Sequence, residues 1–426
     1  MNAEIKKRIE MIRRGEVPEG YKRTKIGIMP ITWEIERIGK ITKEISQKNK
    51  VSNINHVVSV TKHRGIVDSL DYFNNYQVYS KDLSVYKIIQ KGEYAFPPIH
   101  LNEGSIGRLD HLEKAVLSPM YIVFKLNSSK YNSDIFYSII KSQKYIELYK
   151  SMVQGTVNRR GAISYNDFAS IPVINPLLPE QDKIAKILST WDSAIELKEQ
   201  FLMEKKKQKK WLMQKLLTGK IRLSEYTDKW KELKLRNICD HVLGGGTPSR
   251  TVRHFYKGNI PWITVKDLDG AKYKFNSVEH INAEAIKKST AKIVPKDNLI
   301  ISTRMGLGRG FINKVDMAIN QDMKGIIISK HLVASEFLYY CFIKLSNKFV
   351  KLGSGSTVKG IDLRTLLNMD FLLPPLPEQK AIAEILSMAD REIDLHEKQL
   401  DELKKQKIAL MQLLLTGIVR VNLKAM

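Results

Sequence analysis

The sequence predicts an α+β protein in which two mixed α/β domains are joined by two long antiparallel coiled-coil helices with pseudo-twofold symmetry. Three observations lead to this fold class. A long helical segment occurs twice, as LPEQDKIAKILSTWDSAIELKEQ from residue 178 and as LPEQKAIAEILSMADREIDLHEKQ from residue 376. Each copy follows a segment of short β-branched and aromatic runs, which are typical of strands. The interiors of those two preceding segments do not align with each other.

Each copy of the repeat has the start and stop signals of one long helix. Pro179 and Pro377 fall where the first helical residue is expected, and a glutamate follows each at the positive end of the helix dipole. Gly219 and Gly417 fall where a left-handed C-terminal cap is expected. The sequence therefore predicts two helices of about 38 residues, or about 57 Å at roughly 1.5 Å per residue.

The apolar residues of both copies recur at alternating steps of four and three, which is the a and d pattern of a coiled coil. The predicted seam residues are Ile184, Leu188, Trp191, Ile195, Leu202, Leu212 and Leu216 in the first copy, and Ile382, Leu386, Ile393, Leu400, Leu403, Leu410 and Leu414 in the second. Two matching seams in one chain favour pairing of the two helices over two separate core helices. Because a compact domain between them brings its ends close together, we expect the pair to be antiparallel.

The repeat divides the chain into five segments. We expect an N-terminal helix in residues 1–16, a first domain in 17–175, a central helix in 176–222, a second domain in 223–373 and a C-terminal helix in 374–426. The domains begin with similar phrases that align Trp33 with Trp230, and each ends in a basic, glycine-containing turn. The sequence therefore predicts a repeated frame around two different interiors.

Charge and composition narrow the class of partner. The net charge of +25 and the pI near 9.7 favour a polyanion such as nucleic acid. No apolar run reaches the roughly 18 residues of a membrane span, and the charged N-terminus lacks a signal-peptide pattern, so we expect a cytoplasmic protein. The two cysteines, Cys239 and Cys341, form no CxxC pair, which gives no support for a zinc site or a disulfide framework.

The sequence contains no recognisable catalytic motif. It lacks a GxxxxGK[ST] loop, and its two Pro-Pro pairs, in FPPI and LPPL, do not match the Asp/Asn-Pro-Pro-aromatic motif of adenine methyltransferases. We therefore expect no catalysis and no metal site. Two functions stay open at this point, a DNA reader and a structural coiled-coil adaptor with protein-binding domains.

Polar and basic loop residues are the candidates for contact with DNA, because Arg, Asn and Ser/Thr read base edges while Lys and Arg neutralise phosphate. In the first domain these are Lys62, Arg64, Arg108, Asn158, Arg159 and Arg160. In the second domain they are Thr247, Ser249, Arg250, Arg253, Lys266, Ser302, Arg304, Arg309 and Lys359.

The whole chain resembles the specificity (S) subunit of a Type I restriction–modification system. The resemblance lies in PEGYKRTKIGIMP from residue 18, in VSVTKHRGIV with GSIGRL, in GGGTPSR with GNIPWITVKDL, and in the two Leu-Pro-Glu-Gln helices that end in Leu-Thr-Gly. It implies a non-catalytic subunit whose two domains are target-recognition domains, each reading one half of a split DNA site. It also implies that the helices space the halves and dock two methyltransferase subunits. Those subunits would bring S-adenosylmethionine, and restriction/translocase subunits would bring ATP and Mg²⁺.

Overall fold

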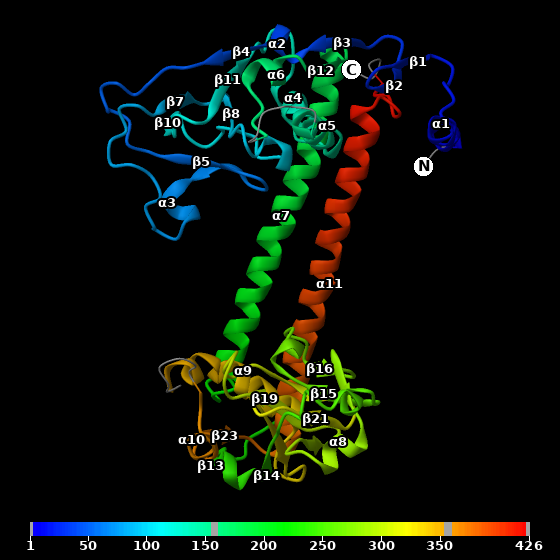
Figure 1. Ribbon diagram of the computed structural model, residues 1–426. Coiled ribbons are helices and arrows are strands. Elements are labelled where there is room, and N and C mark those ends of the chain that lie inside the picture. Colours follow the sequence, from blue (N-terminus) through cyan, green and yellow to red (C-terminus); the bar gives the residue numbers. More distant parts are fainter. Residues whose placement is uncertain (1–2, 155–160, 353–359, 423–426) are drawn as a thin grey trace. The chain divides into compact units, whose positions relative to one another are not determined.

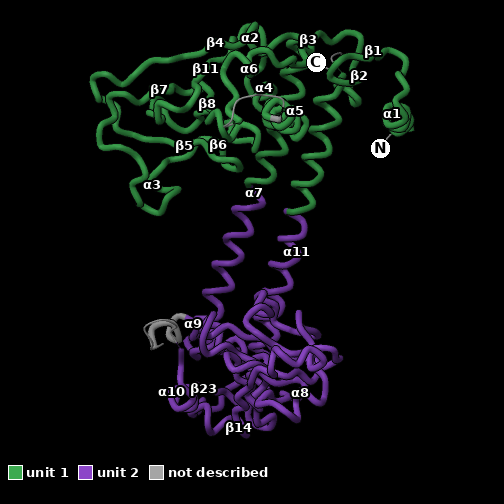
Figure 2. The backbone as a smooth tube through the Cα atoms, viewed as in Figure 1, with its two compact units in different colours: residues 1–196, 401–426 green, residues 197–400 purple. Residues whose placement is uncertain are grey.

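The computed structural model describes residues 3–154, 161–352 and 360–422 (Figure 1). The chain divides into two compact units, which are residues 1–196 with 401–426 and residues 197–400 (Figure 2). The division falls inside both long helices, α7 (Leu178–Leu216) and α11 (Leu376–Leu415). Each unit therefore contains one α+β domain together with one part of each helix.

Unit 1 is built on a four-stranded sheet in the order β4-β11-β8-β9. Its aromatic core includes Tyr94, Phe124 and Phe136, and it packs on Ile184 of α7 and Leu414 of α11. The other elements are four two-stranded sheets and the helices of the unit. In chain order the elements are α1 (Ala3–Arg13), β1 (Tyr21–Thr24), β2 (Gly27–Pro30), β3 (Glu34–Arg37), α2 (Ile38–Ile41), β4 (Thr42–Ile45), β5 (Val58–Thr61), β6 (Gly65–Asp68), α3 (Ser69–Tyr72), β7 (Lys87–Gln90), β8 (Tyr94–Phe96), η1 (Leu101–Glu103), β9 (Gly107–Arg108), β10 (Lys114–Leu117), β11 (Ile122–Leu126), α4 (Ser133–Ile140), α5 (Gln143–Gln154), α6 (Tyr165–Ala169) and β12 (Pro172–Asn175).

Unit 2 has a five-stranded sheet in the order β14-β22-β19-β20-β16 and a four-stranded sheet in the order β17-β15-β21-β18. Its largest core joins Ile301, Ile326 and Phe337 of the domain to Leu216 of α7 and Leu386 of α11. In chain order the elements are β13 (Lys231–Lys234), η2 (Leu235–Asn237), β14 (Cys239–Gly244), η3 (Arg253–Tyr256), β15 (Ile260–Ile263), η4 (Val265–Asp267), β16 (Tyr273–Lys274), β17 (Glu279–Ile281), α8 (Ala283–Lys287), β18 (Lys292–Val294), β19 (Leu299–Ser302), β20 (Gly310–Asn313), β21 (Met317–Ile319), β22 (Met323–Ile328), α9 (Ser335–Leu352), α10 (Leu363–Leu367) and β23 (Asp370–Leu373).

The two domains share a strand order that their sequences do not reveal. The order β4-β11-β8-β9 in unit 1 corresponds to β14-β22-β19-β20 in unit 2, and β3 pairs with β12 as β13 pairs with β23. The two domains also share a backbone contact: a residue near the end of each domain donates a hydrogen bond to the segment that follows the equivalent strand, β8 in unit 1 and β19 in unit 2. Ile163 N donates to Pro98 O at 3.0 Å, and Ile361 N donates to Thr303 O at 2.9 Å. The prediction of different interiors therefore holds for the sequences but not for the central sheet.

The two long helices pair within each unit, and the contacts run antiparallel. In unit 2, Lys198 Nζ lies 2.7 Å from Gln399 Oε1 and Lys205 Nζ lies 2.6 Å from Glu392 Oε1, so the partner number falls as the α7 number rises. Lys209 pairs with Asp390 in the same unit, and Lys407 pairs with Asp192 in unit 1. Every predicted seam residue is buried or partly buried. Lys198, Lys205 and Lys209, which occupy positions of the apolar seam of α7, thus have polar partners on α11.

Each domain is also fixed to a helix start by one buried glutamate. In the Glu180 cluster of unit 1, Trp33 Nε1 donates to Glu180 Oε2 at 2.8 Å, and Arg420 donates to the same carboxylate at 2.7 and 3.0 Å. In the Glu378 cluster of unit 2, Trp230 Nε1 donates at 3.0 Å and Arg222 donates at 3.1 and 2.7 Å. Both glutamates are almost fully buried. They act as specific partners of a Trp and an Arg, which is more than the dipole role predicted from the sequence.

The glutamine that follows each of these glutamates holds the closing helix of the domain. Gln181 Oε1 accepts from Asn132 N, the residue before α4, at 2.8 Å. Gln379 Oε1 accepts from Ala334 N, the residue before α9, at 2.9 Å. These side chains satisfy backbone donors that a helix start leaves without an intrahelical partner. The repeated Pro-Glu-Gln phrase therefore fastens each domain to the helix that follows it.

Candidate nucleic-acid interface

The first domain presents two predicted cations at the tip of the β5–β6 hairpin. Lys62 and Arg64 are exposed there, on either side of the exposed His63. The tip is held by Thr61, whose Oγ1 accepts from Arg64 N at 3.0 Å and donates to Gly65 O at 3.1 Å. A fixed hairpin with three basic or titratable side chains is suited to contact a phosphate backbone.

Arg108 is bound more tightly within the domain than the sequence suggested. Its Nε lies 2.6 Å from Asp110 Oδ1 and its Nη1 lies 2.7 Å from Asp134 Oδ1, and only 16% of the side chain is exposed. Burial alone would lower the pKa of Arg108, but the hydrogen bonds to Asp110 and Asp134 outweigh burial and raise it. The guanidinium ties β9 to the start of α4, which leaves little of it for a ligand.

A second basic group in the first domain was missed by sequence reasoning. A cavity of about 720 Å³ is lined by Lys48 and Lys50, which follow β4, and by Lys114 of β10. All three lysines are exposed. The signal was present as the run Lys-Asn-Lys at residues 48–50, but only the fold places Lys114 beside it.

The second domain has a cavity of about 620 Å³ at the ends of β14 and β22, and Arg304, Gln321 and Lys324 line it. Of the predicted residues, Arg304 lines this cavity, and Thr247 lies behind the lining, where its Oγ1 donates to Gln321 Oε1 at 2.5 Å. Gln321 and Lys324 were not predicted. They belong to the phrase QDMKG, which has no motif character.

A different set of predicted cations gathers around Glu279. Arg250 Nη1 lies 2.7 Å from Glu279 Oε2 and Lys266 Nζ lies 3.1 Å from Glu279 Oε1. The Arg250 guanidinium also stacks 4.4 Å from the centre of the Tyr256 ring and 5.1 Å from that of Trp262. Both cations remain more than half exposed, at 56% and 64%, so they can still meet a phosphate.

The remaining predicted residues are scattered. Ser249 hydrogen-bonds Thr251, Arg253 is exposed in η3, and Arg309 is exposed after β19. Ser302 is fully buried and donates to Met305 O at 2.6 Å, so its side chain shapes a loop and is not placed to contact DNA. Asn158, Arg159, Arg160 and Lys359 lie outside the described residues.

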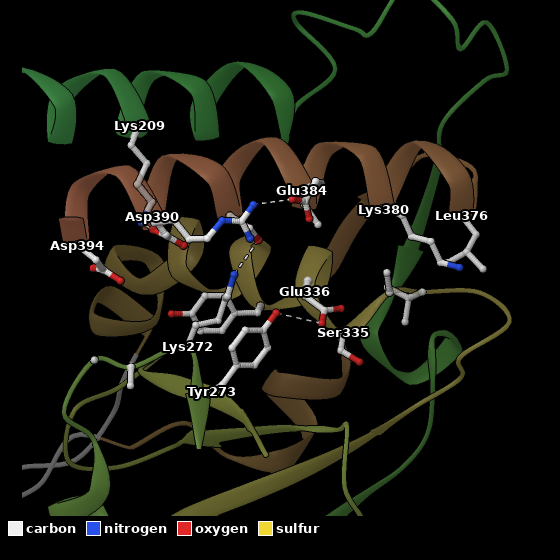
Figure 3. Close-up of a pocket in the computed structure, with 18 of the residues that line it drawn as sticks. Lys209, Lys272, Tyr273, Ser335, Glu336, Leu376, Lys380, Glu384, Asp390 and Asp394 are labelled. Atoms are coloured by element: carbon white, nitrogen blue, oxygen red, sulfur yellow. Dashed lines mark hydrogen bonds and ion pairs between the residues drawn. The ribbon is translucent and has the colours of Figure 1, made fainter. Parts of the chain in front are cut away.

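The cavity between β16, the start of α9 and one face of α11 in unit 2 is polar, with a volume of about 810 Å³ (Figure 3). Several of its polar groups are paired. Lys272 Nζ donates to Ser387 Oγ at 2.7 Å, Arg391 pairs with Glu384 at 2.7 Å, and Tyr340 OH donates to Asp390 Oδ2 at 2.5 Å. These contacts bind the second domain to α11.

The described residues contain no cluster of three or more His, Cys, Asp or Glu side chains that could hold a metal ion. In the same described parts of the chain, no helix is both long and apolar enough to cross a membrane. The arrangement is thus one of two similar domains with exposed basic loops on a helical frame, which is the design of a modular binding protein.

The chain belongs to the Type I restriction modification DNA specificity family. The family model matches it twice, at residues 30–204 and 227–405, so that each match spans one domain and much of the helix after it. The putative specificity subunit of type I restriction enzyme MjaX from Methanocaldococcus jannaschii is 26% identical over 426 residues, covering 95% of this chain and 97% of the relative. The specificity subunit of EcoR124I/EcoR124II from Escherichia coli is 28% identical over 265 residues, 57% of this chain and 63% of the relative.

Two solved structures share the fold. One, from a study of complex assembly and conformational transition of the type I R-M system, has a TM-score of 0.60 at 16% identity and covers 92% of this chain and 99% of its own. The HsdS subunit from Thermoanaerobacter tengcongensis has a TM-score of 0.50 at 17% identity and covers 92% and 98%. At these identities the likeness is one of fold. The resemblance found in the sequence is confirmed by the family match.

Proposed function

We propose that this chain is the DNA-reading, non-catalytic subunit of a cytoplasmic Type I restriction–modification complex. Each target-recognition domain reads one half of a bipartite site in duplex DNA. The observation that carries this proposal is the shared strand order of the two domains combined with different exposed cations on their loops, Lys62 and Arg64 in one and Arg304 in the other. A common scaffold with different loop chemistry suits two readers of different words.

The long helices serve as the spacer between the words and as the dock for two methyltransferase subunits. A helix of 39 residues is about 58 Å long, and the same face of duplex DNA recurs roughly every 34–36 Å. The target is therefore two short words separated by several unread base pairs. The methyltransferase subunits would supply S-adenosylmethionine, and restriction/translocase subunits would supply ATP and Mg²⁺.

A domain exchange tests the proposal. The full chain is assembled with its methyltransferase subunits, and methylated sites are mapped by sequencing. Replacing residues 223–373 with the corresponding domain of a relative is expected to change one word of the site and to leave the other intact. A change in both words, or in neither, would contradict modular reading.

The alternative of a structural adaptor is tested on the same material. The purified complex is titrated with random duplex DNA at increasing salt. A DNA reader that neutralises several phosphates loses affinity steeply as salt rises. An adaptor with protein-binding domains would show no binding that depends on salt in this way.

A further inference from the structure

The cavity of the second domain beside Arg304 contains polar groups that the fold does not use. Gly244 of β14, Lys324 of β22, Arg304 after β19, and Gln321 just before β22 all border it. Three chain segments that are distant in sequence therefore bring side-chain donors to one opening of about 620 Å³.

Lys324 is the first indication that the cavity receives a ligand. Its side chain is partly buried, and no hydrogen bond or ion pair joins its ammonium group to any residue that the structure describes. Burial and the nearby Arg304 lower the pKa of Lys324. Gly244 leaves room for the ammonium group, since a Cβ at that position would lie 3.4 Å from Nζ. A partly buried cation without a partner is unfavourable, and an acceptor from outside the chain would relieve this cost.

Arg304 and Gln321 supply further donors beside this ammonium group. The side chain of Arg304 is 60% exposed, and its ion pair with Asp322 is long, at 3.6 Å, so the guanidinium is free to take a better acceptor. The Oε1 of Gln321 is occupied by the Thr247 hydroxyl, which fixes the amide and leaves its NH₂ group as the free end. Two nearby carboxylates also hold hydrogen bonds from the chain itself, since Asp322 Oδ2 accepts from Asn320 and Asp362 accepts from Thr365.

We propose that Arg304 and Lys324 read a guanine in the word recognised by the second domain, with Gln321 positioned beside them by Thr247. The inference rests on the proposed function and adds which base the second domain recognises at this site. Guanine presents two acceptors, O6 and N7, in the major groove, whereas cytosine presents a donor, adenine a donor with one acceptor, and thymine a single acceptor, O4, beside its methyl group. Two cations side by side match the two acceptors of guanine better than the single acceptor of thymine or the donor-bearing edges of cytosine and adenine. A phosphate would satisfy the same donors, and the test separates the two.

The test measures methylation by the complete complex on duplexes that carry each of the four bases at each position of the second word. The variants are Arg304→Ala and Lys324→Met, and the control is Lys287→Ala, which removes an exposed positive charge of α8 in the same unit. We expect kcat/KM on the target to fall about 10-fold or more in both variants, within the range for loss of a bidentate base contact. Discrimination at one guanine of the second word should relax, while the first word and the control stay unchanged.

Two results would overturn the inference. An equal loss on all sequences would show that Arg304 and Lys324 hold phosphate, and unchanged discrimination would show that they do not face the DNA. Thermal unfolding of each variant identifies a loss of fold, and Lys324→Gln, which keeps a donor without the charge, then replaces Lys324→Met. If the unmodified complex methylates no bipartite site at all, the proposed function fails, and this outcome is distinct from a failure of the guanine assignment.

Discussion

Replacing Arg420 with methionine tests whether the end of the chain stabilises the first domain. Arg420 donates twice to Glu180, a residue that is 1% exposed and whose other side-chain partner is Trp33. Methionine keeps most of the aliphatic length of arginine and removes the charge. The buried carboxylate then retains a single hydrogen bond from the Trp33 indole.

The expected loss follows from the burial of the two partners. Breaking a fully buried ion pair costs about 3–5 kcal/mol because it leaves one charge unpaired. The Arg420 side chain is 36% exposed, so water partly replaces it. We therefore expect the free energy of unfolding of unit 1 to fall by about 2–3 kcal/mol, or roughly 4–12 °C in Tm for a unit of this size.

Calorimetry on the full chain measures this change, with Lys186→Met as the matched control, because Lys186 is an exposed residue of α7 in the same unit. The double variant Arg420→Met with Glu180→Gln should lose less stability than the sum of the single variants, since it removes both charges together. A loss in Arg420→Met no greater than in the control, or strict additivity in the double variant, would refute this account.

Three further outcomes are expected. Leu386→Ala should destabilise unit 2 by about 3 kcal/mol because Leu386 is fully buried, whereas Leu395→Ala, at a position 54% exposed on the same helix, should stay within about 0.5 kcal/mol in denaturant unfolding. Burial lowers the pKa of Lys141 from 10.5 to about 8. Between these two pH values the unfolded chain binds more protons than the folded chain, so the free energy of unfolding should rise with pH. The rise should be smaller in Lys141→Met. Adding seven residues, about 10 Å, to both α7 and α11 should lengthen the unread gap of the methylated site by about 3 base pairs and leave its words unchanged.

The two long helices, α7 and α11, were predictable from the sequence because short-range sequence signals define them. A proline start, a glycine end and a four-three apolar spacing specify a long helix whatever surrounds it, and α7 and α11 begin and end near the predicted residues. The partners of Glu180 and Glu378 were less visible. In each cluster the Trp and the Arg both lie more than a hundred residues from the glutamate in the sequence. No local sequence pattern therefore predicts the contact. The available signal was the nearly equal spacing of these residues in both copies, 147 residues from Trp33 to Glu180 and 148 from Trp230 to Glu378.

The roles of the polar loop residues, in contrast, could not be predicted from the sequence. Residue type alone placed Arg108, Ser302 and Arg304 in one class, yet the fold binds Arg108 to two carboxylates, buries Ser302 and leaves Arg304 exposed. Lys324, in contrast, was not predicted as a site residue, because no motif surrounds it in the sequence. The pairing of β14 with β22 places it in the cavity. Whether a polar loop residue faces a ligand depends on its neighbours in space, and those come from distant segments.

The composition of unit 1 has a consequence for synthesis on the ribosome. Unit 2 is one continuous stretch, residues 197–400, whereas unit 1 needs residues 401–426 in addition to 1–196. At about 5–20 residues per second, the first domain emerges roughly 10–45 s before the segment that completes it. During that interval Glu180 has no Arg420, and the apolar face of α7 has no partner from the end of α11. The domain that is translated second can therefore finish folding first, and residues 401–426 complete the first domain only after residues 197–400 have been made.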